Sequence, residues 1–369
     1  VNVSLSSWSA TQTFSPFLSL SWAMEAANAA KLGYDLSKAE IWEAVLADPE
    51  AVFNHIIATV SELAPSLLVV DSISQLAGLD LRTYVTNAVY RALRPAGTDV
   101  VLTCEEESAG PLAYIADNII HLTRRVTGNG VVLRQMDFEK LRGRQAGGVK
   151  AFEIIDGAGV VLLDELRASF RRPHAVYPTG IRGLDEMLGG GLASGSVNVL
   201  LASYTPTALR LLSAAVAGLS KSGARVLFAA RSMEPGKAEE LARRLGGGAE
   251  ARPVDVKPEA YAWATYGLYK ALEEVQPDVV VTDWLDVDFA VYGPEEALRA
   301  FLRNARILRE AGVALLAVSS RDYGLSLFSD SVVSLEEGGE AATLRAVKTA
   351  ALDVPRLCKI DMKTLETSG

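Results

Sequence analysis

The sequence predicts an α/β protein made of two tandem, doubly wound, mainly parallel sheets with flanking helices. Two observations lead to this fold class: short apolar runs alternate with segments of helical periodicity, and the whole pattern occurs twice within 369 residues. Strands of a parallel sheet are covered on both faces and therefore appear as continuous apolar runs. A chain of this length accommodates two domains of ordinary size.

Five apolar runs carry the strand prediction. They are "SLLVVDSI" from Ser66, "TDVVLTCE" from Thr98, "ARVLFAARS" from Ala224, "PDVVVTDW" from Pro277 and "VALLAVSS" from Val313. Helical periodicity marks "AMEAANAAKLGYDL", "PGKAEELARRLG" and "PEEALRAFLRNARILREAG" between them. In the last of these, Pro294 opens the helix and Gly312 follows its end, as is typical of helix boundaries.

The internal repeat supports two copies of one unit. "VNVSLSSWSATQT" from Val1 matches "VNVLLASYTPTAL" from Val197 at an offset of 197 − 1 = 196. "PSLLVVDSISQL" from Pro65 matches "PDVVVTDWLDVD" from Pro277 at 277 − 65 = 212, and Asp117 matches Asp330 at 330 − 117 = 213. A recurring unit of this kind indicates a tandem repeat.

The change of offset places a deficit of 212 − 196 = 16 residues near Thr13 and Phe14, where the second copy has the helical run "RLLSAAVAGLSKSGA". A crossover between parallel strands needs a dozen or more residues. Either the first copy lost this helix or residues are missing from the sequence there, and the second interpretation is favoured. The start of the chain has no counterpart to "YPTGIRGLDEMLGGGLASG" and is expected to be incomplete as well.

These matches divide the chain into a first domain over residues 1–164, a linker over 165–178 and a second domain over 179–369. The linker is polar, basic and contains proline, as connecting segments often do.

Composition narrows the class of protein. The net charge of −9 and the pI near 5.1 argue against a general polyanion binder, which carries a basic face. Cys104 and Cys358 are too few for a disulfide framework and indicate a reducing compartment. The beginning lacks the features of a signal peptide, and no apolar run is long enough to cross a bilayer. We expect a soluble, cytoplasmic protein.

One loop stands where a phosphate site is expected. The strand around Val197 is followed by a short loop and a helical run, the order that makes a phosphate cradle with the pattern G-x-x-x-x-G-K-[ST]. Residues Ser203 to Arg210 read "SYTPTALR" and contain neither the glycines nor the lysine.

Two groups of motifs resemble the KaiC-like branch of the RecA superfamily of ATPases. The first is "TGIRGLDEMLGGGLASGS" before the strand at Val197. The second is "VLTCEEESAGPLAYIADNIIHL" with "LRQMDFEKLRGRQAGGVKAFEIIDGAGV" in the first copy. The resemblance implies a P-loop ATPase fold and assembly into rings, usually hexamers, with ATP at the subunit boundary.

The resemblance assigns positions to the phosphate site. Its lysine corresponds to Leu209 in the second copy and Thr13 in the first, and its Mg²⁺-binding hydroxyl corresponds to Arg210. Trp8 and Tyr204 are matched aromatics (204 − 8 = 196), which we expect to fill the vacated cradles as buried side chains; stacking on a purine or a partner peptide is the alternative. The expected remnants of nucleotide sites are Ser203, Tyr204, Thr207, Leu209, Arg210, Trp8, Thr13, Asp71 and Asp283.

The acids that family members use for hydrolysis are only partly present. The paired glutamates correspond to Ser19 and Leu20 in the first copy and to Arg231 and Ser232 in the second, and arginine cannot act as a base at neutral pH. Asp71 and Asp283 remain at strand ends, where they either hold Mg²⁺ through water or cap the next loop.

Lys140 and Arg142 in "EKLRGR" project from the same face of a strand. The resemblance implies contact with the γ-phosphate of a neighbouring subunit, and the alternative is a solvated basic edge strand. Aligning Arg134 with Arg345 (345 − 134 = 211) replaces the two cations by Ala351 and Asp353 in the second copy, which would then have lost them.

The leading hypothesis is a non-catalytic KaiC-like protein that acts as an assembly or regulatory partner, with self-association or a KaiC-like ATPase as its partner. One alternative is an ATPase active only in the first domain or at subunit interfaces, and another is an accessory protein of DNA recombination. No catalytic residue, metal or cofactor is expected, and ATP with Mg²⁺ enters only if the loop at Thr13 is incomplete. His55, His121 and His174 are too scattered to form a metal or catalytic cluster.

Overall fold

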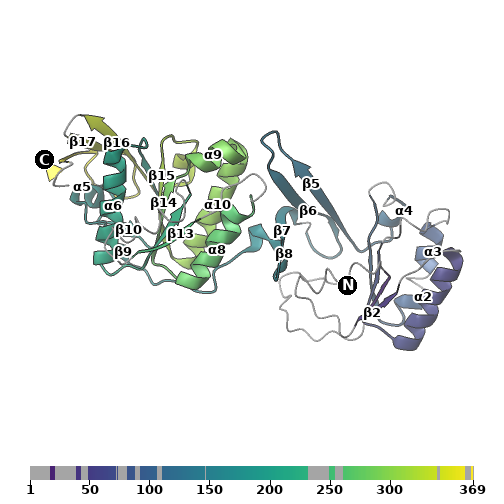
Figure 1. Cartoon of the computed structure of the whole chain (residues 1–369). Coiled ribbons are helices and arrows are strands. Elements are labelled where there is room, and N and C mark those ends of the chain that lie inside the picture. Colours follow the sequence, from purple (N-terminus) through teal and green to yellow (C-terminus); the bar gives the residue numbers. More distant parts are fainter. Residues whose placement is uncertain are drawn as a thin grey trace. The chain divides into compact units, whose positions relative to one another are not determined.

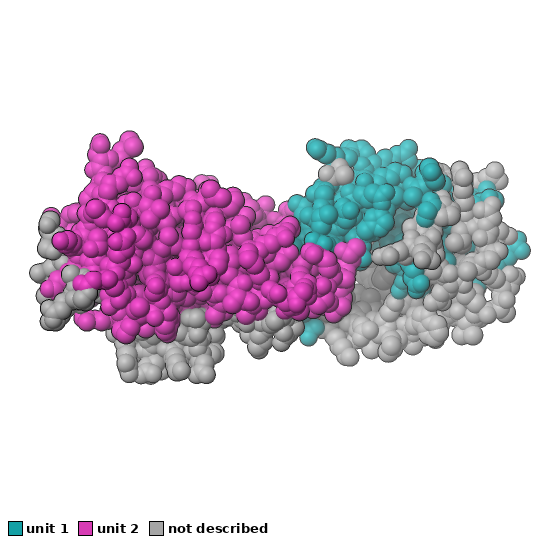
Figure 2. Space-filling view, turned by 90° about the horizontal axis from the view of Figure 1, so that it is seen from above, with its two compact units in different colours: residues 1–122, 135–161 teal, residues 123–134, 162–369 magenta. Residues whose placement is uncertain are grey.

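The computed structural model forms two compact units, which are described separately. Unit 1 comprises residues 1–122 and 135–161, and unit 2 comprises residues 123–134 and 162–369 (Figure 2). The structure describes residues 17–20, 39–42, 49–71, 73, 81–87, 92–105, 110–145, 147–231, 249–253, 261–338, 341–361 and 367–368. Among them, no helix combines the length and the apolar character that crossing a bilayer requires.

Unit 1 contains a parallel sheet with the strand order β2-β1-β3-β4 (Figure 1). Its strands are β1 (Phe17–Leu20), β2 (Ala39–Trp42), β3 (Leu67–Val70) and β4 (Asp99–Leu102). Helices α2 (Pro49–Leu63) and α3 (Leu81–Asn87) accompany this sheet. The core contains Phe53 and Ile56 of α2, Leu68 of β3 and Val85 of α3.

A second sheet has the order β5-β6-β7-β8, in which β6 and β7 are antiparallel. Its strands are β5 (Asn118–Val126), β6 (Val132–Leu141), β7 (Gly148–Ile155) and β8 (Gly159–Leu162), and the short helix α4 (Gly110–Ala113) precedes β5. The tip of the β5–β6 hairpin belongs to unit 2, where Val131 and Leu133 enter the core.

Unit 2 is built on a sheet with the order β13-β12-β14-β15-β11-β16-β17-β18-β19. The strands from β13 to β16 are parallel, and β17, β18 and β19 add antiparallel pairings. The parallel strands are β11 (Val197–Leu201), β12 (Val226–Ala230), β13 (Ala249–Pro253), β14 (Val279–Trp284), β15 (Ala314–Ser319) and β16 (Ser331–Gly338). The others are β17 (Ala341–Lys348), β18 (Leu357–Asp361) and β19 (Thr367–Ser368), with β9 (Val176–Tyr177) and β10 (Leu192–Ala193) forming a separate antiparallel pair.

Helices cover both faces of this sheet (Figure 1). Helices α5 (Arg182–Met187) and α6 (Pro206–Lys221) pack into one core. Helices α8 (Trp263–Val275), α9 (Asp286–Tyr292) and α10 (Pro294–Ala311) pack into the other. The short helix α11 (Leu325–Phe328) precedes β16, and η5 (Leu163–Glu165) is a 3₁₀ turn at the start of the unit.

The predicted mixed α/β character with parallel sheets is confirmed. All five apolar runs contain a strand, and α10 begins at Pro294 and ends before Gly312, as predicted. The order β2-β1-β3-β4 in unit 1 is also the order of β13-β12-β14-β15 in unit 2, with parallel pairing in both. The helices predicted over 23–36 and 235–246 lie outside the described residues.

The start of the predicted linker lies along unit 2 in extended form. Leu166, Ala168 and Phe170 pack against the core under α8 and α10 because alternate side chains of an extended chain point to the same side. Polar contacts fix the segment at several positions. They are Asp164 to Arg303 at 2.6 Å, Arg167 to Glu310 at 2.7 Å, the Ser169 N–H to Glu273 at 2.8 Å and the Arg172 N–H to the Ala311 carbonyl at 2.7 Å.

Helix α6 approaches the loop before α5 so closely that no side chain fits between them. A Cβ atom on Gly218 would lie 1.8 Å from the Thr179 carbonyl oxygen. The Gly191 backbone has φ +138°, and a Cβ there would lie 2.4 Å from the Tyr177 carbonyl oxygen. Both glycines are therefore required by backbone contact, which explains part of the glycine run after Leu188.

We expect Gly218→Ala to destabilise the protein by about 1–3 kcal/mol or more, because the new methyl group overlaps backbone that cannot move independently. Gly267→Ala is the matched control, since Gly267 is also helical and its Cβ would meet only Trp263 at 3.5 Å. The control should be neutral or slightly stabilising. Urea unfolding of both variants measures the difference, and equal midpoints would contradict the close approach.

Candidate functional site

The strand-loop-helix segment of unit 2 forms as predicted. Strand β11 ends at Leu201, and α6 begins at Pro206 with Thr205 as its N-cap. The Ala208 N–H donates to Thr205 Oγ1 at 3.1 Å, and the Leu209 N–H donates to the Thr205 carbonyl at 3.0 Å. Pro206 has no N–H to offer. The N–H groups of Ala208 and Leu209 therefore both point to Thr205.

A carboxylate lies beside this cap. Thr205 Oγ1 hydrogen-bonds Glu337 Oε1, and Glu337 lies near the end of β16, the strand next to β11. Negative charge is favourable at a helix N-terminus because of the helix dipole. Glu337 thus supplies negative charge beside the N-terminus of α6. Sequence analysis missed Glu337, since a hairpin 132 residues away gives no local signal.

The expected remnants take different environments. Leu209 is half-buried and packs against the core shared by α5 and α6. Arg210 and Ser203 are exposed, and Thr207 is half-buried. Leu209 therefore contributes apolar packing at the position to which the resemblance assigned the lysine. Trp8 and Thr13 lie outside the described residues.

The prediction that Tyr204 is a buried plug is wrong, because 60% of its surface is exposed. Its ring packs edge-on against Trp284 with the centroids 4.6 Å apart. Trp284 is buried instead, and its Nε1–H donates to the Ala202 carbonyl at 2.7 Å. The indole comes from β14, so it already occupies the space beneath the loop and leaves Tyr204 on the outside.

The carboxyl ends of β12 and β14 are joined by acidic and basic side chains. Asp283 is fully buried and accepts a hydrogen bond from the Arg231 N–H. The Arg231 guanidinium pairs with Asp288 at 2.6 Å, and both side chains are buried. Burial raises the pKa of Asp288, although the charge of Arg231 opposes this shift. Arg231 is thus part of a buried ion pair; Ser232 lies outside the described residues.

Asp71 follows β3 in unit 1 and accepts a hydrogen bond from Thr103, which follows β4. Both acids at strand ends therefore hold a neighbouring strand end. The described residues bring together no group of three or more His, Cys, Asp or Glu side chains suited to a metal ion.

Strand pairing corrects one assignment in the first copy. Ser19 and Leu20 lie inside β1, opposite Val69 and Val70 of β3. Arg231, by contrast, follows the last residue of β12. Placing Ser19 and Leu20 at the position of Arg231 was therefore wrong, because the alignment was displaced along the strand.

Lys140 and Arg142 both have partners within unit 1. Lys140 Nζ donates to the Ala113 carbonyl at 3.1 Å and to the Ala116 carbonyl at 2.7 Å. The Arg142 guanidinium pairs with Asp117, and this hydrogen bond lowers the pKa of Asp117. The Arg142 side chain remains 66% exposed. The lysine therefore fixes the end of α4, and the arginine lies at the surface.

In unit 2, Lys348 makes a contact like that of Lys140, whereas the predicted alignment placed Ala351 at that position. Lys348 Nζ donates to the Ser326 carbonyl of α11 at 2.9 Å. Ser326 is the counterpart of Ala113 at the offset of Asp117 and Asp330 (326 − 113 = 213). Lys348 thus makes the same contact as Lys140. The alignment on Arg134 and Arg345 failed because the two hairpins differ in length: Lys140 follows Asp117 by 23 residues, and Lys348 follows Asp330 by 18.

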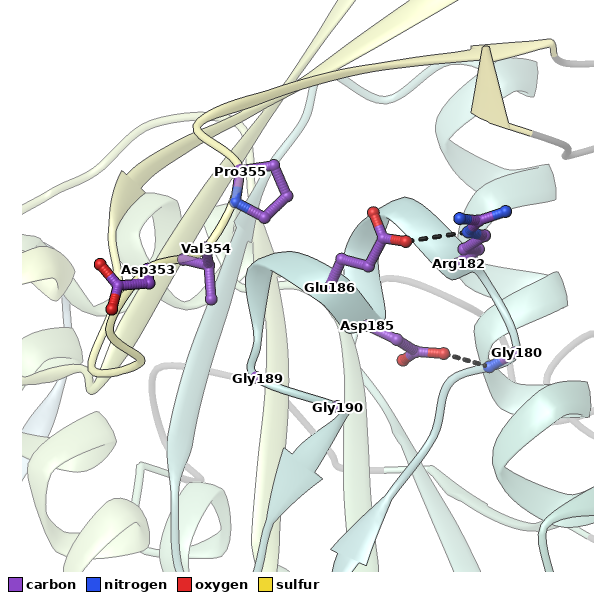
Figure 3. Close-up of a pocket in the computed structure, with 9 residues that line it drawn as sticks. All are labelled: Gly180, Arg182, Asp185, Glu186, Gly189, Gly190, Asp353, Val354 and Pro355. Atoms are coloured by element: carbon purple, nitrogen blue, oxygen red, sulfur yellow. Dashed lines mark hydrogen bonds and ion pairs between the residues drawn. The ribbon is translucent and has the colours of Figure 1, made fainter. Parts of the chain in front are cut away.

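The motif "TGIRGLDEMLGGG" lines an open hollow of about 550 Å³ opposite the turn that carries Asp353 and Pro355 (Figure 3). Asp185 accepts hydrogen bonds from the Thr179 N–H and hydroxyl, both at 2.7 Å, and from the Gly180 N–H at 3.0 Å. Burial raises the pKa of Asp185 against these bonds. The Leu-Asp part of the motif therefore closes the loop on which Gly218 packs.

Comparisons with known proteins agree with the motifs. The family model described as "ATPase: KaiC" matches residues 22–167. The chain is 26% identical over 251 residues to the circadian clock oscillator protein KaiC of Acaryochloris marina, which covers 63% of this chain and 47% of that protein.

Two further relatives match shorter regions. Protein GvpD2 of Halobacterium salinarum is 35% identical over 128 residues, 31% of this chain and 26% of that protein. The DNA repair protein RadA of Mycobacterium tuberculosis is 28% identical over 137 residues, 37% of this chain and 27% of that protein. The chain thus spans less than half the length of these relatives. Residues 22–167 are thus similar to the ATPase family of KaiC.

Proposed function

We propose that this protein is a non-catalytic, KaiC-like assembly or regulatory partner whose second unit neither binds nor hydrolyses ATP. The observation that carries the proposal is the internally closed start of α6. Thr205 caps the helix, Pro206 removes a donor, and Glu337 supplies a negative charge beside the cap. A bound phosphate would have to compete with this carboxylate and would find no lysine, since Leu209 packs against the core.

The position of Arg231 supports the same proposal. A glutamate that orients water must reach solvent and substrate, whereas the Arg231 and Asp288 side chains are only 4% and 5% exposed. Their charges neutralise each other inside the unit. We infer that this pair is structural and takes no part in hydrolysis.

We also propose that the two units are copies of one RecA-like domain. The shared strand order and the matching contacts of Lys140 and Lys348 support this interpretation. In a tandem arrangement, ATP and Mg²⁺ would be confined to the first copy, whose loop at Thr13 lies outside the described residues. A DNA-binding role is disfavoured by the net charge of −9.

Photolabelling of the full chain with an azido analogue of ATP, followed by peptide mapping, locates any nucleotide site. The proposal expects no label on peptides covering residues 197–231. Label there that excess ATP removes would contradict it, whereas label confined to residues 1–122 would support the alternative of an ATPase active only in the first domain.

Leu209→Lys should destabilise the protein by about 1–3 kcal/mol without creating affinity for Mg-ATP, because it places a charge against an apolar core. Arg210→Lys is the matched control, since the adjacent side chain is exposed and keeps its charge. Calorimetric titration and thermal unfolding of both variants test this. A folded Leu209→Lys protein that gains micromolar affinity would show that the loop can still cradle phosphate.

Arg231→Met should cost about 3–5 kcal/mol at neutral pH because it leaves the Asp288 carboxylate buried without its partner. The folded-state pKa of Asp288 then rises further above its unfolded value of about 3.9. Between these two values the folded protein binds more protons than the unfolded chain, so stability falls as the pH rises through this window. Melting temperatures measured from pH 4 to 8 check the slope.

The double variant Arg231→Met/Asp288→Leu is the control for this titration, since no charge remains to titrate. Its melting temperature should recover toward the wild-type value and lose the added pH dependence. A flat profile for the single variant would mean that Asp288 is not shielded from bulk solvent.

Single alanine variants of Arg142 and Lys140 test whether this region contacts a partner. Arg142→Ala should leave stability within about 1 kcal/mol, because exposed ion pairs contribute little. Lys140→Ala should cost about 1.5–3 kcal/mol, because it removes charged hydrogen bonds to two carbonyls. If Arg142 contacts a partner's nucleotide, Arg142→Ala alone reduces the turnover of a KaiC-like ATPase mixed with this protein. No stimulation by the wild type would leave Arg142 as a solvated surface cation.

A further inference from the structure

A compact polar cluster lies within the apolar layer between the sheet of unit 2 and helices α8, α9 and α10. Its members come from five elements or their ends: Arg231 after β12, Thr282 in β14, Thr265 in α8, Asp288 in α9 and Asn304 in α10. All five residues are at most 8% exposed. The surrounding side chains, such as Ala229 and Leu268, belong to the hydrophobic core.

Shared partners bring these side chains together. Arg231 Nη1 lies 2.6 Å from Asp288 Oδ1. Arg231 Nη2 and Asn304 Nδ2 both donate to the Ala264 carbonyl, at 3.5 and 2.9 Å. Thr265 follows Ala264 in α8. Thr282 of β14 pairs with Ala229 of β12, and Ala229 lies two positions before Arg231. Strand alternation turns the Arg231, Ala229 and Thr282 side chains to the same face of the sheet.

Each member of the cluster has one buried polar atom with no hydrogen-bond partner in the protein. These atoms are Arg231 Nε, Asp288 Oδ2, Asn304 Oδ1, Thr265 Oγ1 and Thr282 Oγ1. The set contains a charged donor, two acceptors and two hydroxyls that donate or accept. Leaving one such group unsatisfied in a protein interior is costly, and native proteins contain few of them.

We propose that this cluster is a buried hydration site, in which ordered water accepts from Arg231 Nε and donates to Asp288 Oδ2 and Asn304 Oδ1. The ligand class follows from the charges. The arginine N–H would repel a metal cation, and the Asp288 carboxylate would repel an anion, while the pair together is neutral. A neutral ligand that both donates and accepts fits all five atoms, and buried water commonly makes about three hydrogen bonds.

The site would couple elements that the backbone does not connect by hydrogen bonds. Water bound there adds links from the end of β12 and strand β14 to three helices, beside the direct Arg231 contacts with Asp288 and Ala264, in a layer that is largely apolar. Such networks are favourable only when every member is satisfied. This inference is independent of the proposed function, because it rests on the contacts of buried groups and not on whether the protein binds ATP.

Thr282→Val and Thr265→Val distinguish a hydrated cluster from a dry one by the sign of their effect. If water bonds the hydroxyls, removing either hydroxyl should lower the folding equilibrium constant about fivefold, the value of one hydrogen bond. If the hydroxyls are unsatisfied in a dry interior, valine removes an unsatisfied polar group and raises the folding equilibrium constant. Thr343→Val in strand β17, away from the cluster, corrects for the intrinsic effect of the substitution.

A second measurement detects the ligand itself. Magnetisation transfer from water to the Arg231 Nε–H in the full-length protein should show a water molecule resident for longer than nanoseconds. Transfer to this N–H together with destabilising valine variants supports the proposal. Stabilising valine variants, or an Arg231 Nε–H without transfer from water, would overturn it.

Discussion

The hydrogen bonds of Thr205 determine how the central segment of unit 2 is built. With its side chain on the Ala208 N–H and its carbonyl on the Leu209 N–H, Thr205 satisfies the first turn of α6 from within the chain. This fixes the direction of the helix, so Leu209 turns toward the core and Gly218 meets the Thr179 carbonyl. The Glu337 hydrogen bond then ties the β16–β17 hairpin to the same point. Cap, core packing and hairpin therefore meet at one point of the chain.

The carboxyl edge of the sheet, where α/β proteins commonly place ligands, is occupied here by the chain's own polar groups. Asp283 holds the Arg231 N–H, and Asp286 after β14 accepts the Ser320 N–H after β15 at 2.8 Å. In unit 1, Asp71 and Thr103 join two strand ends in the same way. Aspartates at strand ends, which bind metals or substrates in some proteins, here connect neighbouring strands. A sequence motif cannot distinguish these uses, because it does not record what each acid contacts.

Apolar patterns predicted strands β3, β4, β12, β14 and β15, and helix boundary residues predicted α10, because these signals are local. Three site predictions failed for non-local reasons. Tyr204 is exposed because Trp284, 80 residues away, fills the space below it. Lys348 was missed because a shorter hairpin changed the spacing, and Ser19 was misplaced because only strand pairing defines where β1 ends. The Arg231–Asp288 pair likewise joins residues that no pattern connects.

The segment from Asp164 to Arg172, which is extended after the 3₁₀ turn η5, has a mechanical consequence. Its contacts with α8 and α10 are spaced along its length, so the loss of one contact leaves the others in place. The segment is therefore a fixed part of unit 2 and not a free tether.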